Sequence, residues 1–98
     1  MKNNSIVLLM LMCTLTCIID DYYPALKTSK HYRTLYLYLT RRCIDGTIEK
    51  GVVIPAIYLE SFLKLIDHLK ILISVYPNNA AQKELKTVLN RLKEITAM

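Results

Sequence analysis

The chain has 98 residues, a formal net charge of +5 and a hydrophobic fraction of 53%, and much of the hydrophobic excess lies in the first nineteen positions. This length allows one small domain and excludes a catalytic domain with a separate substrate-binding module. The positive charge favours anionic partners such as nucleic acid or lipid headgroups, although a modest surplus is also common on inert surfaces. Cys13, Cys17 and Cys43 are too few and too scattered for a disulfide framework, and no nearby His turns the C-x₃-C spacing into a zinc motif.

Residues 1–19 form an apolar N-terminal segment with a positive charge at Lys2 and an uninterrupted apolar run from Ile6 to Met12. This pattern is typical of a secretory signal peptide over residues 1–17, with Thr14 and Thr16 as small residues before a cut, although no Ala-x-Ala site is present. The run is short for a membrane span, which needs roughly 20 apolar residues. The alternative is a buried strand or helix of the fold. A cleaved or anchoring segment predicts a secreted or membrane-associated protein.

Residues 20–98 are expected to form a single small α+β domain, built on an antiparallel sheet. It begins with a polar transition over residues 20–31, in which Pro24 confines any short strand around residues 22–27 to the edge of the sheet. A β-hairpin is predicted over residues 32–54. From residue 32 to residue 40, leucines alternate with tyrosines and threonines, which gives a strand one apolar face and one Tyr-rich face.

The return strand of this hairpin is predicted at Val52-Val53-Ile54. Asp45-Gly46 tolerates the positive φ angles of a tight turn between the two strands. Pro55 cannot continue a ladder of hydrogen bonds but suits the first turn of a helix. The predicted order is therefore strand, turn, strand and helix.

Two amphipathic helices are predicted, over residues 56–75 and 80–96. The first has more apolar positions than one small sheet can cover, which indicates a second packing partner. Asn79 and Gln82 resemble a capping box at the start of the second helix. That helix folds back on the first or pairs with the same helix of another copy, and a homodimer through the helices is expected.

Catalytic, metal and cofactor sites are not expected. His31 and His68 are the only imidazoles, and neither stands in a Ser-His-Asp or Cys-His arrangement. Cys43 is expected to be a structural thiol. Gly46 and Gly51 do not form a phosphate-binding loop. The chain is therefore expected to be non-enzymatic.

The Tyr-rich face of the predicted hairpin is a candidate nucleic-acid-binding site. Aromatic rings can stack on unpaired bases while cations neutralise phosphates, which suits single-stranded nucleic acid. The predicted contacts are Arg33, Tyr36, Tyr38, Arg41, Arg42 and Lys50. The alternative is that the tyrosines cover a second packing layer, such as the N-terminal segment or the last helix.

Residues 34–69 resemble the single-stranded-DNA-binding core of the positive cofactor four (p15) type transcriptional coactivators. The resemblance lies in an alternating strand that ends at Arg41, a turn at Gly46, a Lys50-Gly51 step before three apolar residues, and an immediate helix. It implies a dimeric nuclear or intracellular protein in which Arg41 and Lys50 contact the nucleic-acid backbone. The aromatic residue that the family has shortly after the Arg is Ile44 here.

Two functions of different classes follow from the sequence. The first is a non-enzymatic single-stranded nucleic-acid-binding protein that resembles a transcriptional coactivator. The second is a small secreted or membrane-tethered protein-interaction module, whose helices present an apolar surface to a protein partner. Self-association of the Leu-rich helices within a larger assembly is a third possibility that the sequence does not rank against the second.

Overall fold

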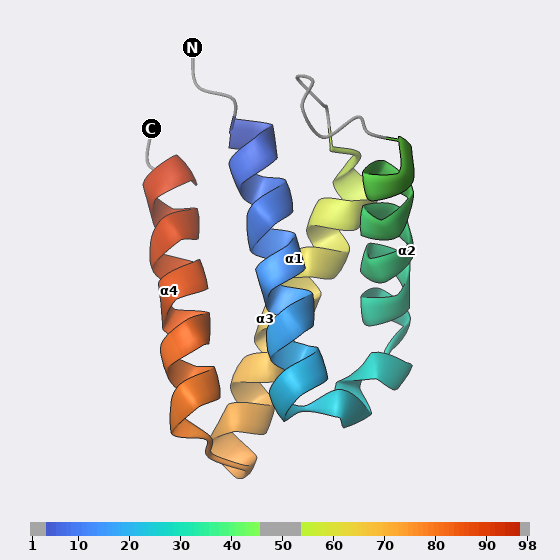
Figure 1. Ribbon diagram of the computed structural model, residues 1–98. Coiled ribbons are helices and arrows are strands. Elements are labelled where there is room, and N and C mark those ends of the chain that lie inside the picture. Colours follow the sequence, from blue (N-terminus) through green and yellow to red (C-terminus); the bar gives the residue numbers. More distant parts are fainter. Residues whose placement is uncertain (1–3, 46–53, 97–98) are drawn as a thin grey trace.

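The computed structural model describes residues 4–45 and 54–96. This part of the chain is a bundle of four α-helices and a short 3₁₀ helix: α1 (Asn4–Tyr22), η1 (Pro24–Thr28), α2 (Lys30–Asp45), α3 (Ala56–Val75) and α4 (Asn79–Thr96). Figure 1 shows α1 between α4 and α2, with α3 crossing behind it. The main packing contacts join α1 to α4 and α2 to α3, and α1 also contacts α2.

The predicted α+β fold is wrong. Residues 32–40, expected to form the first strand, lie within α2, and the described residues contain no strand. The edge strand expected around residues 22–27 is replaced by the end of α1 and by η1. The predicted Gly46 turn and most of the return strand lie outside the described residues, whereas Ile54 is a buried residue just before α3. The helices predicted over residues 56–75 and 80–96 are confirmed as α3 and α4.

α2 is a helix because its apolar and aromatic residues also fit a period of 3.6. Tyr32, Leu35 and Leu39 follow one another at three- and four-residue spacing, and Tyr38 lies on the same side. All four are buried. Leu37, which a strand would place beside Leu35 and Leu39, is exposed. A helix therefore buries two tyrosine rings that the strand pattern assigns to the exposed face.

Side-chain caps mark the first turns of two helices. The His31 amide donates to Ser29 Oγ at 3.2 Å, and the Ala81 amide donates to Asn78 Oδ1 at 3.0 Å. Each contact satisfies an N–H group that the helix itself leaves free, and such caps are worth about 1 kcal/mol. The capping residue of α4 is thus Asn78, one position before the predicted Asn79.

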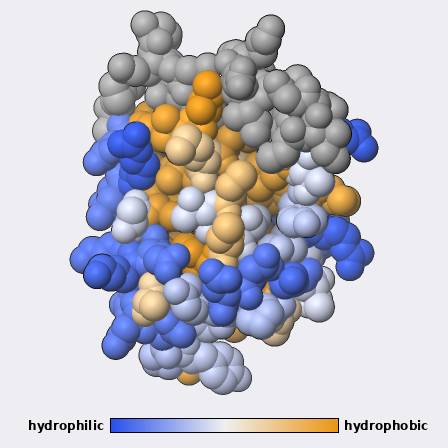
Figure 2. Space-filling model, viewed as in Figure 1, coloured by the Kyte–Doolittle hydropathy of each residue, from blue (hydrophilic) through white to orange (hydrophobic). Residues whose placement is uncertain are grey.

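The apolar N-terminal segment forms the centre of the core as α1. Leu9, Met12, Leu15, Ile18 and Ile19 are all at most 1% exposed. In the described part of the chain, no helix is both long enough and apolar enough to cross a bilayer. Figure 2 shows apolar atoms over the upper part of α1, with hydrophilic side chains along α4 at the left edge. The signal peptide stays a prediction. Cleavage after residue 17 would remove several buried residues of the core, including Leu9, Met12 and Leu15.

Two tyrosines connect α1 to its neighbours through hydrogen bonds. The Tyr22 hydroxyl donates to Glu84 Oε2 of α4 at 2.8 Å. The Tyr32 hydroxyl of α2 donates to Asp20 Oδ1 of α1 at 3.0 Å. These contacts hold the C-terminal end of α1 to both flanking helices, so the polar groups there add specificity to the apolar packing.

The core position of α1 gives a stability prediction. Leu15→Ala removes a side chain that is 0% exposed, and the cavity should lower the free energy of unfolding by about 2–5 kcal/mol. Met10→Ala, at a position that is 61% exposed on the same helix, is the matched control and should change it by less than about 0.5 kcal/mol. Urea unfolding followed by circular dichroism measures both changes. Equal effects of the two substitutions would contradict the position of α1 in the core.

Candidate functional site

The candidate site is an open groove between α3 and α4. These helices are consecutive, but they make few close backbone contacts because α3 packs mainly on α2 and α4 on α1. Figure 1 shows them meeting near the turn after α3 and then diverging. The space between them has a volume of about 600 Å³ and is open to solvent on one side. We term it the α3–α4 groove.

The turn between the two helices closes one end of this groove. The Tyr23 hydroxyl, just after α1, donates a hydrogen bond to the carbonyl oxygen of Tyr76. The Tyr76 amide in turn donates to the Leu72 carbonyl oxygen at 2.7 Å and ends α3. Pro77, Ser74 and Gln82 line the groove near this turn. The closed end is therefore held against the end of α1.

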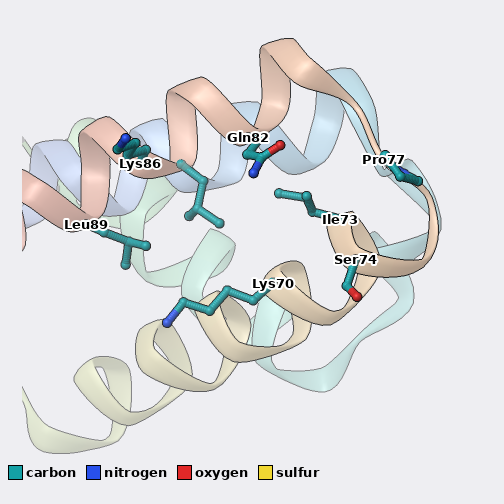
Figure 3. Close-up of a pocket in the computed structure, with 8 residues that line it drawn as sticks. Lys70, Ile73, Ser74, Pro77, Gln82, Lys86 and Leu89 are labelled. Atoms are coloured by element: carbon teal, nitrogen blue, oxygen red, sulfur yellow. The ribbon is translucent and has the colours of Figure 1, made fainter.

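The floor of the groove is apolar. Ile73 of α3 and Leu85 of α4 are buried against the core, and Leu89 is half-buried. Figure 3 shows Ile73 and Leu89 pointing into the space between the two helices. The floor thus offers aliphatic side chains from both walls to a ligand.

Two lysines line the groove above this floor. Lys70 comes from α3 and Lys86 from α4, and both are exposed (Figure 3). Within residues 4–45 and 54–96, neither ammonium group forms an ion pair; the ion pairs found there are Lys27–Asp20 and Arg91–Glu94. An apolar floor with positive charge on both walls can bind a ligand that is itself apolar in the middle and anionic at its edges.

Beyond the residues that line the groove, each helix has a further apolar residue on the same side that is not fully buried. Leu63 lies seven residues before Lys70, two helical turns away on the same side of α3, and is 52% exposed. On α4, Leu92 follows Leu89 at three-residue spacing and is half-buried. The residues that line the groove run from Lys70 to Pro77 on the α3 side and from Gln82 to Leu89 on the α4 side, so the groove is about two helical turns long.

The predicted nucleic-acid-binding residues are divided by the structure. Arg33, Tyr36 and Arg41 are exposed on α2, on the side away from its buried residues. Tyr38 is only 8% exposed and stacks on Tyr58 of α3, with ring centroids 4.0 Å apart. Arg42 belongs to α2, but its side chain lies outside the described part of the chain, as does Lys50 altogether.

The exposed face of α2 keeps one aromatic ring for stacking. Tyr36 is 48% exposed and stacks with one face on Tyr32, at a centroid separation of 5.8 Å and an interplanar angle of 11°. Arg33, three residues before Tyr36, lies beside it on the helix. Lys30 and Arg41 lie on the neighbouring side, around the exposed Leu37. One cation therefore accompanies the half-exposed ring, and two more lie further around the helix.

The two histidines, 37 positions apart in sequence, meet between α2 and α3. The ring centroids of His31 and His68 are 5.9 Å apart, a proximity that sequence reasoning does not find. In the described part of the chain, no group of three or more His, Cys, Asp or Glu residues could hold a metal ion. The pair on its own is not a metal centre.

No family model, curated protein or solved structure matches this chain. The resemblance of residues 34–69 to the positive cofactor four type coactivators therefore stays a prediction, although the residues expected as its strand are helical.

The contact between Tyr32 and Asp20 predicts a pH dependence of stability. Burial, and after it the hydrogen bond to the Asp20 carboxylate, together raise the pKa of Tyr32 from 10.0 to about 12. A raised folded-state pKa gives stability that is present below pH 10 and is lost as the pH rises towards 12. Tyr32→Phe should flatten this alkaline loss, measured as urea midpoints against pH.

Tyr76→Phe is the control for the loss of one phenol, since that side chain is 65% exposed. Absorbance of the phenolate reports the titration directly. An alkaline loss of stability that is identical in wild type and Tyr32→Phe would contradict the assignment.

Proposed function

We propose that the chain is a non-enzymatic protein-interaction module that receives an amphipathic helix of a partner protein in the α3–α4 groove. The observation that carries this proposal is the open, apolar groove of about 600 Å³ between two consecutive helices. Its volume falls within the range of about 300–1,000 Å³ that is common for ligand pockets, and aliphatic side chains from both helices line it.

A third helix is the occupant that fits this shape. Helices pack with axes about 8–10 Å apart, and a helix laid between two diverging helices contacts both. Such a helix would contact the groove through apolar anchor residues at three- and four-residue spacing. Such anchors contribute about 1.5–3 kcal/mol each when fully buried, before the cost of association. Ile73 and Leu85 are only 9% and 4% exposed, so the half-buried Leu89 supplies most of the floor that remains accessible to such anchors.

The homodimer expected from the sequence concerns another surface. If two copies shared the groove across a two-fold axis, Lys70 and Lys86 of one copy would face the same lysines of the other, which is unfavourable. A second copy has other exposed apolar residues on α3, namely Ile71 and Val75 one turn apart, with Ile57 beyond the exposed Lys64 and His68 on the same side. We therefore assign the groove to a different protein, and the homodimer stays a prediction.

A synthetic amphipathic helix with a leucine stripe and uncharged flanks tests the groove. We expect micromolar binding in fluorescence anisotropy. Leu89→Gln should weaken binding roughly tenfold, because it replaces an apolar floor residue with a polar one while keeping helix propensity. Ile71→Gln, on the outer side of α3 at 61% exposure, is the matched control and should bind as the wild type does.

Equal binding by the two variants, or no binding by the wild type, would exclude the groove as the docking site. Size-exclusion chromatography over a range of protein concentrations tests whether a second copy of the chain occupies the groove. Self-association that the peptide competes away would assign the groove to a second copy instead.

Single-stranded nucleic-acid binding on the exposed face of α2 is a second candidate function. The specific observation in its favour is that Lys30, Arg33, Tyr36 and Arg41 are all exposed on α2, with Arg33 beside Tyr36, while residues 30–41 contain no carboxylate. Backbone phosphates would be neutralised by the cations, and bases would stack on Tyr36. The burial of Tyr38 removes the second stacking ring that the sequence predicts.

A labelled single-stranded oligonucleotide at low salt tests this face. Three phosphate contacts predict that the logarithm of the association constant falls with the logarithm of the salt concentration with a slope of about −2. Arg33→Glu/Arg41→Glu should abolish binding. Lys70→Glu/Lys86→Glu is the control, because it makes the same change in net charge away from α2. This variant should keep most of the oligonucleotide binding. Equal losses in both variants would show a response to net charge alone.

A further inference from the structure

We propose that the helix bound in the α3–α4 groove carries carboxylates on both edges of its apolar stripe, paired with Lys70 on one wall and Lys86 on the other. This inference rests on the proposed function, because it assigns the chemistry of the partner at the same groove. It identifies the partner as an acidic amphipathic segment.

The charge of the groove has one sign. The residues that line it include two lysines and no carboxylate. Within α4, the positions three and four residues from Lys86 are Gln82, Lys83, Leu89 and Asn90, so no acid on its own helix can neutralise it. Lys86 therefore presents an uncompensated positive charge to a ligand in the groove.

The acidic residues nearest in sequence are engaged elsewhere or do not pair with these lysines. Glu84 accepts the hydrogen bond of Tyr22, and Glu94 pairs with Arg91 at 3.2 Å. Asp67 lies three residues before Lys70 on α3, but the two form no ion pair among the described residues. Both ammonium groups are therefore available to a ligand.

The placement of the lysines matches the cross-section of an amphipathic helix. A helix with its leucines on the floor would direct the residues beside the stripe towards the two walls. Lys70 lies along the groove on the α3 side, and Lys86 stands on the α4 side (Figure 3). Carboxylates on both edges would meet one lysine each, whereas lysines at those positions would be repelled on both sides.

Three peptides with one leucine stripe and different flanks test the charge assignment. The flanking residues are Glu, Gln or Lys, and dissociation constants are measured by fluorescence anisotropy. Wild-type protein should prefer Glu over Gln and Gln over Lys, with about a tenfold difference between the extremes. Because exposed charges are screened by salt, the difference should shrink as ionic strength rises.

Charge reversal of the two walls should invert this order. Lys70→Glu/Lys86→Glu is expected to bind the Lys-flanked peptide most tightly, because attraction and repulsion exchange places. Arg33→Glu/Arg41→Glu changes the net charge equally on the opposite part of the molecule and should keep the preference for Glu flanks. All four side chains are exposed, so the variants should fold, which circular dichroism checks.

The outcomes separate the inference from the proposed function. Binding of the Gln-flanked peptide without preference between Glu and Lys flanks would overturn the charge assignment and leave the groove as a docking site. An unchanged order in Lys70→Glu/Lys86→Glu, or an inverted order in Arg33→Glu/Arg41→Glu, would likewise overturn it. Failure of all three peptides to bind would remove both the proposed function and this inference.

Discussion

The packing of α1 between α2 and α4 is the constraint on which the rest of the bundle depends. α4 meets the core chiefly through α1, and α3 meets it chiefly through α2. The two outer helices are joined by the turn at residues 76–78, so their ends are close, but their bodies follow different partners. The α3–α4 groove is the space that this division leaves. Its apolar floor is the edge of the core that α1 organises.

The same constraint connects the groove to the N-terminal segment. α4 packs mainly on α1, and the buried α1 residues Leu9, Met12 and Leu15 all lie within the residues that match a signal peptide. A chain without those residues would expose the apolar side of α4, and α4 would no longer be held at its present distance from α3. The groove is thus a property of the chain that retains α1, and targeting by cleavage would require a different arrangement of the remaining helices.

α3 and α4 could be predicted from the sequence because their apolar residues fit only a period of 3.6. α2 could not be predicted in the same way, because its leucines and tyrosines alternate over residues 35–39 and so also fit a period of 2. The error lies in assigning tyrosine to the exposed face. Tyr32 and Tyr38 are buried, one with its hydroxyl on Asp20 and the other with its ring on Tyr58. One signal of a helix is present, namely a Ser at the cap position, Ser29.

The surplus of apolar residues over 56–75 correctly indicates that this helix has more than one neighbour. What the sequence does not contain is the divergence of α3 from α4, because that depends on which helix packs on α1 and which on α2. Ile73 and Leu89 are unremarkable core positions in a helical pattern, and only the packing places them on a surface. Lys70 and Lys86 are likewise ordinary exposed lysines until the two helices bring them to opposite walls.

The exposed side of α2 and the α3–α4 groove are both basic, so the net charge of the chain does not favour one over the other as the binding surface. The two surfaces differ in shape. The cations of α2 lie on the convex surface of a single helix, where a ligand remains in contact with water and each exposed ion pair contributes little. The lysines of the groove lie beside a concave apolar floor formed by two helices, where a ligand loses water on both sides and apolar contact adds to charge. Shape and charge therefore act together only at the groove, and this is the physical reason for assigning it the main function.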